Sequence, residues 1–143
     1  MSSRFVIDAS ALIRYLVNGA GGDQVELLLT RAHAGQAELM MSSVNWGEVF
    51  YVLLRDYEPA QARQLASWLR QLPFTVVSSG QPEAEHAAVL KQQFHLPYAD
   101  SYAGALAQRE KATLVTADYD FKAMIAAIEI VFLPAEPGKK SKP

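Results

Sequence analysis

Short apolar runs recur along the chain and alternate with longer segments in which apolar residues are three or four positions apart. Short runs rich in branched apolar residues are typical of buried strands, whereas the wider spacing predicts amphipathic helices. The strands predicted in this way comprise residues 4–7, 38–41, 74–77, 113–115 and 128–132.

Helix-start and helix-stop signals divide the segments between these strands. Asp23 and Glu26 have the spacing of a capping box, which predicts a helix that ends before Gly35. Pro59 suits the first turn of another helix. The first predicted helix starts at Asp8 or Ser10, and the later ones comprise residues 23–34, 43–55, 59–72, 79–94, 97–110 and a short segment that starts at Asp118.

Strands that alternate with helices predict β-α-β units and therefore an α/β fold, with a central and mostly parallel sheet flanked by helices. The length of 143 residues fits one domain, which we place at residues 1–133. Residues 134–143 are rich in Pro, Gly and Lys, and this composition predicts a flexible C-terminal tail.

Composition narrows the classes of protein that fit. Half of the residues are hydrophobic, so the chain can build a substantial core, and the formal net charge is −2. Overall charge therefore does not hold the protein to nucleic acid, and local cations or a bound metal would have to do so. The chain has no cysteine, no signal-peptide pattern and no apolar stretch long enough for a bilayer. These features predict a cytoplasmic protein without a membrane partner.

Four acids lie where predicted helices begin or just inside them: Asp8, Glu48, Asp100 and Asp118. Two of them, Asp8 and Asp118, also follow predicted strands. Open α/β sheets bind ligands at the carboxyl ends of their strands, so the four acids are candidates for one site. Carboxylates gathered there would repel one another, and a hard divalent cation such as Mg²⁺ would relieve that repulsion.

Each acid also has a simpler structural explanation. Asp8 and Asp118 could cap helices, Glu48 could lie on a solvated face, and Asp100 could interact with a helix dipole. Neighbouring polar residues favour a functional site, and those that could support it are Ser10, Asn45, Thr116 and Asp120. Asp120 is either a supporting group or an exposed capping acid.

Other reactive or aromatic groups are less informative. The three histidines show no spacing typical of metal ligands, and no Ser–His or Cys–His arrangement is present. Tyr98 and Tyr102 could stack on a nucleobase, although packing is the simpler interpretation. Arg14 and Lys91 could contact phosphates, but nothing in the sequence places them near the acids.

Four segments, in order, resemble those of PIN-domain ribonucleases, and especially the VapC-type toxins of toxin–antitoxin pairs. These segments are DASAL at 8–12, SVNWGE at 43–48, LPYADS at 96–101 and LVTADYDF at 114–121. The resemblance implies that Asp8, Glu48, Asp100 and Asp118 hold Mg²⁺ or Mn²⁺, supported by Ser10 and Thr116. It also implies cleavage of RNA, a cognate VapB-type antitoxin and a homodimer.

Two other classes of function remain open from the sequence. A flavodoxin-like phosphoacceptor or phosphoryl-transfer domain also gathers acids at strand ends. The segment Asp8-Ala9-Ser10 argues against the phosphatase type, because its nucleophile motif has a second Asp two residues on. A catalytically silent PIN domain that acts only as a binding module is the other alternative, and the full set of acids argues against it.

Overall fold

The computed structural model describes residues 3–137. Within them, five strands form one all-parallel sheet in the order β3-β2-β1-β4-β5. The strands are β1 (Arg4–Ile7), β2 (Glu38–Ser42), β3 (Thr75–Val77), β4 (Thr113–Thr116) and β5 (Ile130–Phe132). The prediction of a single α/β domain with a mostly parallel sheet is therefore confirmed.

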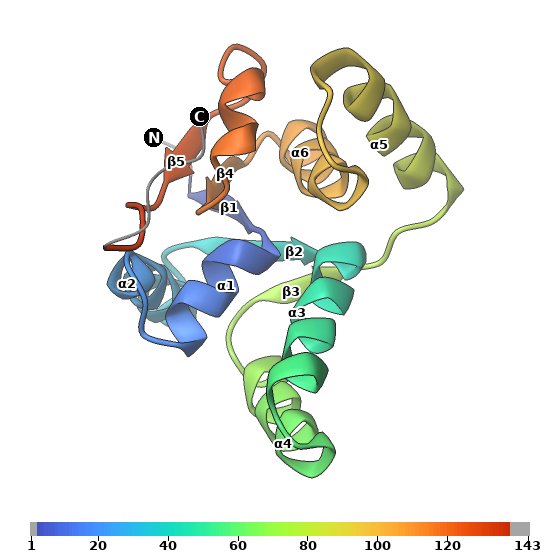
Figure 1. The fold of residues 1–143 in the computed structure, drawn as a ribbon. Helices are drawn as coiled ribbons and strands as arrows, with labels where there is room; N and C mark the ends of the chain where they lie inside the picture. Colours follow the sequence, from blue (N-terminus) through green and yellow to red (C-terminus); the bar gives the residue numbers. More distant parts are fainter. Residues whose placement is uncertain (1–2, 138–143) are drawn as a thin grey trace.

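Helices cover both faces of this sheet (Figure 1). The helices are α1 (Ala9–Leu16), α2 (Gly22–His33), α3 (Ser43–Asp56), α4 (Pro59–Arg70), α5 (Gln81–Phe94) and α6 (Tyr98–Glu110), with a 3₁₀ helix, η1 (Tyr119–Met124). Buried residues of α1 to α4 share one hydrophobic core, and those of α5, α6 and η1 share the other. No helix in the described part of the chain is long and apolar enough to cross a membrane.

Strand residues divide between the two cores by simple alternation. Ile7 and Val115 pack in the core that contains α1 to α4, whereas their neighbours Val6 and Leu114 pack in the core that contains α5 and α6. Successive side chains of a strand point to opposite faces, so a strand covered on both sides must be apolar throughout. This requirement explains why these strands appear in the sequence as continuous apolar runs.

Local sequence signals located the helices but not all of their caps. The expected capping box at Asp23 is absent, because α2 begins at Gly22 and its N-cap is Gly21. Gly21 has a φ of 81°, a left-handed conformation that glycine adopts without steric cost. Similarly, α3 is capped by Ser42, whose hydroxyl accepts a hydrogen bond from the backbone N–H of Val44 at 3.1 Å. The predicted short helix after Asp118 is a 3₁₀ helix.

The start of the expected C-terminal tail contacts the domain. Nη1 of Arg14 donates hydrogen bonds of 2.7 Å to the carbonyl oxygens of Ala20 and Pro134. Nε of the same guanidinium lies 3.2 Å from Oε1 of Glu136. The cation therefore joins residues 134–136 to the turn between α1 and α2. The rest of the expected tail, residues 138–143, lies outside the described residues, and its flexibility stays a prediction.

Candidate active site

The sheet order places the predicted acids around the carboxyl ends of its central strands. β1 pairs with β4, and the residues that follow these strands include Asp8 and Asp118. Glu48 comes from α3, which follows β2, and Asp100 lies in the first turn of α6. Four acids that are scattered in the sequence thus converge on one edge of the sheet.

Asp8 is held rigidly by its neighbours. It caps α1, and its Oδ1 accepts hydrogen bonds from the backbone N–H of Ala11 at 3.0 Å and from Oγ of Ser10 at 2.7 Å. Oδ2 accepts a hydrogen bond from Oγ1 of Thr116 at 2.5 Å. The side chain is 5% exposed, and burial raises its pKa to about 6, although these hydrogen bonds oppose the shift. Asp8 is therefore both a helix cap and a member of the acidic group.

The same two hydroxyls connect Asp8 to the segment that carries Asp118. Oγ of Ser10 accepts a hydrogen bond from the backbone N–H of Ala117 at 2.9 Å. Oγ1 of Thr116 accepts one from the backbone N–H of Asp118 at the same distance. Ser10 and Thr116 are thus placed to position two acids that come from distant parts of the sequence, as expected of supporting groups.

Three aspartates form the tightest group of carboxylates. Asp100, Asp118 and Asp120 each offer a carboxylate oxygen, and these oxygens lie within 4.8 Å of one another. Asp100 and Asp118 are half-buried, whereas Asp120 is exposed. The sequence predicts only a supporting role for Asp120, whereas the structure includes it in this tight group. The backbone explains this position, because the N–H of Asp120 donates to Oδ1 of Asp118 at 2.9 Å and bends the chain back.

Asp100 is the most perturbed acid of the site. Its Oδ2 is buried and has no hydrogen-bond partner. Burial and a hydrogen bond with Asp118 raise its pKa to about 8, and the charges of Asp118, Asp8 and Glu48 add to the shift. Asp8 and Glu48 are not within the tight group of three, but their charges act on the same carboxyl. All four predicted acids therefore share one electrostatic environment.

Glu48 is oriented by the residue one turn before it. Nδ2 of the buried Asn45 donates to Oε1 of Glu48 at 3.0 Å and to the carbonyl oxygen of Ala99 at 3.1 Å. Ala99 directly precedes Asp100, so this amide links α3 to the start of α6. Oδ1 of Asn45 is buried and lacks a partner. A carbonyl oxygen and a carboxylate oxygen, both buried and unpaired, are the kind of groups that a hard cation binds.

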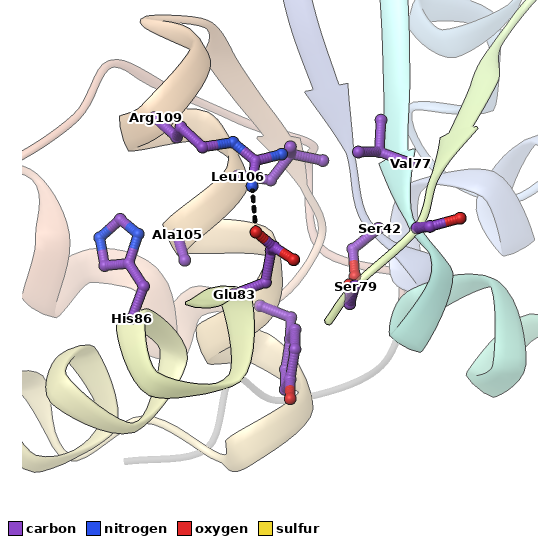
Figure 2. Close-up of a pocket in the computed structure, with 10 residues that line it drawn as sticks. Ser42, Val77, Ser79, Glu83, His86, Ala105, Leu106 and Arg109 are labelled. Atoms are coloured by element: carbon purple, nitrogen blue, oxygen red, sulfur yellow. Dashed lines mark hydrogen bonds and ion pairs between the residues drawn. The ribbon is translucent and has the colours of Figure 1, made fainter. Parts of the chain in front are cut away.

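A small cavity beside the carboxyl end of β3 is distinct from this site (Figure 2). Its volume is about 10 Å³, which is roughly the space that one water molecule needs. Nη1 of Arg109 lies 3.1 Å from Oε2 of Glu83 across it. The cavity is too small for a substrate, and we assign it no binding role.

Comparison with known proteins agrees with this architecture. A family model described as the PIN domain matches residues 5–126. Because this match spans most of the sequence, the chain belongs to the PIN-domain family. No curated protein matches the sequence significantly.

Several solved structures share the fold. VapBC2 from Rickettsia felis bound to a promoter DNA fragment aligns with a TM-score of 0.70 at 14% identity, covering 92% of this chain and 99% of that one. A toxin–antitoxin complex from Klebsiella pneumoniae aligns with a TM-score of 0.64 at 22% identity, covering 91% and 98%. DNA-bound VapBC from Salmonella typhimurium aligns with a TM-score of 0.66 at 15% identity, covering 92% and 98%. At these identities the likeness establishes the shared fold.

Proposed function

We propose that this protein is a metal-dependent endoribonuclease and the toxin of a VapBC-type toxin–antitoxin pair. The observation that carries the proposal is the state of Asp100. One of its oxygens is buried without a partner beside Asp118 and Asp120, and its pKa is raised to about 8. A purely structural carboxyl would not be expected in such a position, because burying an unpaired acid is costly. A role in binding a cation explains the position of this carboxyl group.

The donor set fits Mg²⁺ or Mn²⁺. It consists of carboxylate and amide oxygens, with no cysteine and no histidine among them. Oxygen ligands of this kind select hard divalent ions. We assign Asp8, Asp100 and Asp118 as the primary ligands, with Glu48 completing the second half of the site. Asp120 is close enough to Asp100 and Asp118 to join them.

The residues of the chain would divide the catalytic roles between them. Ser10 and Thr116 fix the carboxylate of Asp8, and Asn45 fixes that of Glu48. Glu48 is then placed to orient an attacking water and to accept its proton. The metal, when bound, lowers the pKa of water and stabilises charge on the phosphate. No covalent nucleophile is required.

A cleavage assay tests this proposal directly. Purified protein should cut RNA in Mg²⁺ or Mn²⁺ and should lose this activity in EDTA. Asp100→Asn should reduce the rate by roughly 100-fold or more, since it removes a charged ligand from the reacting centre. Asp23→Asn is the matched control, because Asp23 is an exposed acid in the first turn of a different helix, α2. Equal cleavage by wild type and Asp100→Asn would overturn the assignment.

The partner would be a VapB-type antitoxin. Several of the similar structures are VapBC or other toxin–antitoxin complexes, which supports a partner of this kind for the present chain. We propose that the antitoxin places a basic side chain near the acids, since Arg pairs well with carboxylates. Binding of its C-terminal peptide should weaken in Asp8→Asn/Asp118→Asn protein and should compete with Mg²⁺. If the affinity for the peptide is the same in the double variant and is not changed by Mg²⁺, this mechanism is wrong.

The alternative functions can be separated from this one by experiment. A flavodoxin-like sheet has the strand order 2-1-3-4-5, and this sheet has the order 3-2-1-4-5. The different strand order argues against a flavodoxin-like phosphoacceptor. If the protein does not bind beryllofluoride, this function is excluded. A catalytically silent binding module should fail to bind Mn²⁺ in a titration, whereas the proposed nuclease should bind it.

A further inference from the structure

An open hollow lies where the end of α5 meets the start of α6, the helix that carries Asp100. Its volume is about 470 Å³, within the range of roughly 300–1,000 Å³ that is typical of small-ligand sites. It is lined by Ala88, Lys91, Gln92, His95 and Tyr98. Nothing in the proposed metal chemistry uses these side chains, so their grouping calls for a separate explanation.

We propose that this hollow binds an unpaired nucleobase of single-stranded RNA, next to the phosphate that is cleaved. The proposal rests on the ribonuclease function proposed above and adds to it a site for part of the substrate. Tyr98 would stack on the base, and Lys91 would contact a neighbouring phosphate. These roles make both residues positioning groups for the substrate.

Tyr98 has the exposure and the rigidity that stacking requires. Its side chain is 46% exposed, although it is a large aromatic at the start of a helix whose middle is buried. Its hydroxyl lies 3.1 Å from the hydroxyl of Tyr102, and the two rings meet edge to face with centroids 5.1 Å apart. Tyr102 is buried and so fixes the exposed ring in place. A fixed aromatic surface binds bases with little loss of side-chain entropy.

The charge of the hollow suits a phosphate-bearing ligand. Its lining includes a lysine, a histidine and a glutamine, and none of its five lining residues is acidic. Nζ of Lys91 donates to the carbonyl oxygen of Leu96 at 3.2 Å, which holds the ammonium at the wall of the hollow. An ammonium has three N–H donors, so others remain for a phosphate. Gln92 offers both a donor and an acceptor to the edge of a base.

The position of the hollow relates it to the reacting centre. Tyr98 precedes Asp100 by two residues in α6, which corresponds to a rise of about 3 Å along the helix axis and a rotation of about 200°, so the two side chains leave different sides of the first turn. Ala99, between them, accepts the hydrogen bond from Asn45 that connects α6 to Glu48. One short segment thus joins an aromatic, cationic surface to the acids. A strand whose phosphate lies at the acids would pass around the N-terminus of α6 to place a nearby nucleotide on Tyr98.

Equilibrium binding tests the subsite without relying on catalysis. We would measure anisotropy of a short, unstructured, fluorescein-labelled RNA in EDTA, in an Asp100→Asn background that cannot cleave it. Adding Tyr98→Ala should weaken binding by about 5- to 100-fold, as expected for loss of one base stack. Tyr98→Phe should stay within about 3-fold of the parent, because the ring remains.

Two matched variants control for general effects. Trp68→Ala removes an aromatic side chain that is 45% exposed, but on α4, which is remote from α6 (Figure 1). It should leave RNA affinity unchanged. Lys91→Ala should reduce the slope of log affinity against log salt by about 0.7, the value for one phosphate contact to a single strand. Lys111→Ala, at the far end of α6, should not change that slope.

The results also separate failure of the subsite from failure of the proposed function. In the Mg²⁺-dependent cleavage assay, Tyr98→Ala should raise KM with little change in kcat. If Tyr98→Ala cleaves RNA at the wild-type rate, with an unchanged KM and an unchanged affinity for RNA, the subsite is overturned. The nuclease function is then still supported. Binding that depends on Tyr98 without any cleavage would support the subsite and contradict the nuclease. Absence of both binding and cleavage would overturn both proposals.

Discussion

The carboxyl groups of Asp100 and Asp8 are in positions that disfavour their ionised forms. Both have raised pKa values, chiefly because they are buried, and the neighbouring acids add repulsion. The fold therefore holds these acids together at a cost to its own stability while no cation is bound. Such a cost is expected at functional sites, where stability is exchanged for a prearranged set of ligands.

Removing one of the neighbouring charges should therefore stabilise the metal-free protein. We expect Asp118→Asn to raise its melting temperature in EDTA by about 3–5 °C, corresponding to ~1 kcal/mol. The asparagine keeps an oxygen that can accept the hydrogen bond from the N–H of Asp120, so the helix cap survives. Added Mg²⁺ should stabilise the wild type by mass action and the variant much less. If Asp118→Asn melts at a lower temperature than the wild type, and Mg²⁺ does not change the melting temperature of the wild type, Asp118 is only a helix cap.

The raised pKa values also fix the direction of the pH dependence. Asp8 and Asp100 bind protons more tightly in the fold than in the unfolded chain, where their pKa is about 4. Their contribution to stability is complete below about pH 4 and is lost as the pH rises through about 6 and then about 8. We expect urea denaturation of the metal-free protein to show a free energy of unfolding that falls over this range.

Variants locate the source of that pH dependence. Asp100→Asn should flatten its upper part, around pH 8, because the titrating group is gone. Asp56→Asn should not, because Arg55 lowers the pKa of Asp56 and the effect of that group lies at acid pH. If the free energy of unfolding of Asp100→Asn falls around pH 8 as much as that of the wild type, other groups cause the pH dependence.

At the scale of elements, α6 and η1 meet through the buried side chain of Met124. Gly104 lies one turn after Asp100 on the same face of α6. A Cβ built on Gly104 would lie 2.8 Å from Sδ of Met124, the last residue of η1. The absence of a side chain at Gly104 therefore leaves room for the thioether of Met124 on the face of α6 that carries Asp100.

A bulky residue at this contact should disturb the site from a distance. We expect Gly104→Leu to cost ~1–3 kcal/mol through overpacking and to weaken Mn²⁺ binding, because the buried side chain of Met124 must move and η1, which carries Asp120, would shift with it. Gly47→Leu provides the control, since nothing lies within 4 Å of a Cβ built at Gly47. Denaturation and Mn²⁺ titration together measure both effects. Unchanged Mn²⁺ affinity in a folded Gly104→Leu protein would show that this packing does not set the site.

The sequence predicted these elements better than it predicted their ends. Apolar runs and proline positions are local signals, and they located the strands and helices. The cap of α2 depends instead on the turn at Gly21, which packs against Leu133 and Pro134 from the opposite end of the chain. The nearness of Asp120 to Asp100 brings together η1 and α6, which β4 separates in the sequence. Contacts between distant segments leave no periodic pattern in the sequence, and these features could not be predicted.

At the scale of the whole molecule, the family resemblance predicts a homodimer. Apolar residues of α3, such as Val49, Tyr51, Val52 and in part Leu53, are candidates for this contact. However, Val49 and Leu53 are fully buried in the core, so they cannot contribute. Tyr51 and Leu54 remain, at 63% and 43% exposed. A dimer that uses this helix must therefore use its outer face.

Sedimentation at micromolar concentration tests this expectation. Wild-type protein should sediment as a dimer, and Tyr51→Glu/Leu54→Glu should shift it toward monomer, because buried charges without partners are costly. Leu27→Glu is the control, since Leu27 is 61% exposed on α2. A monomeric wild type would contradict the dimer, and a dimer that survives the double substitution would place its interface elsewhere.

The hydrogen bond from Thr116 to Asp8 joins residues that are 108 positions apart, and it sets when the site can exist during synthesis. β4 must pair with β1 before Asp118 can approach Asp8. At about 5–20 residues per second, the ribosome adds β4 roughly 5–20 s after Asp8. The acidic site therefore cannot form until the segment that carries Thr116 and Asp118 has been made. A ribonuclease built in this way would spare the messenger RNA that encodes it while the residues between Asp8 and Asp118 are being synthesised.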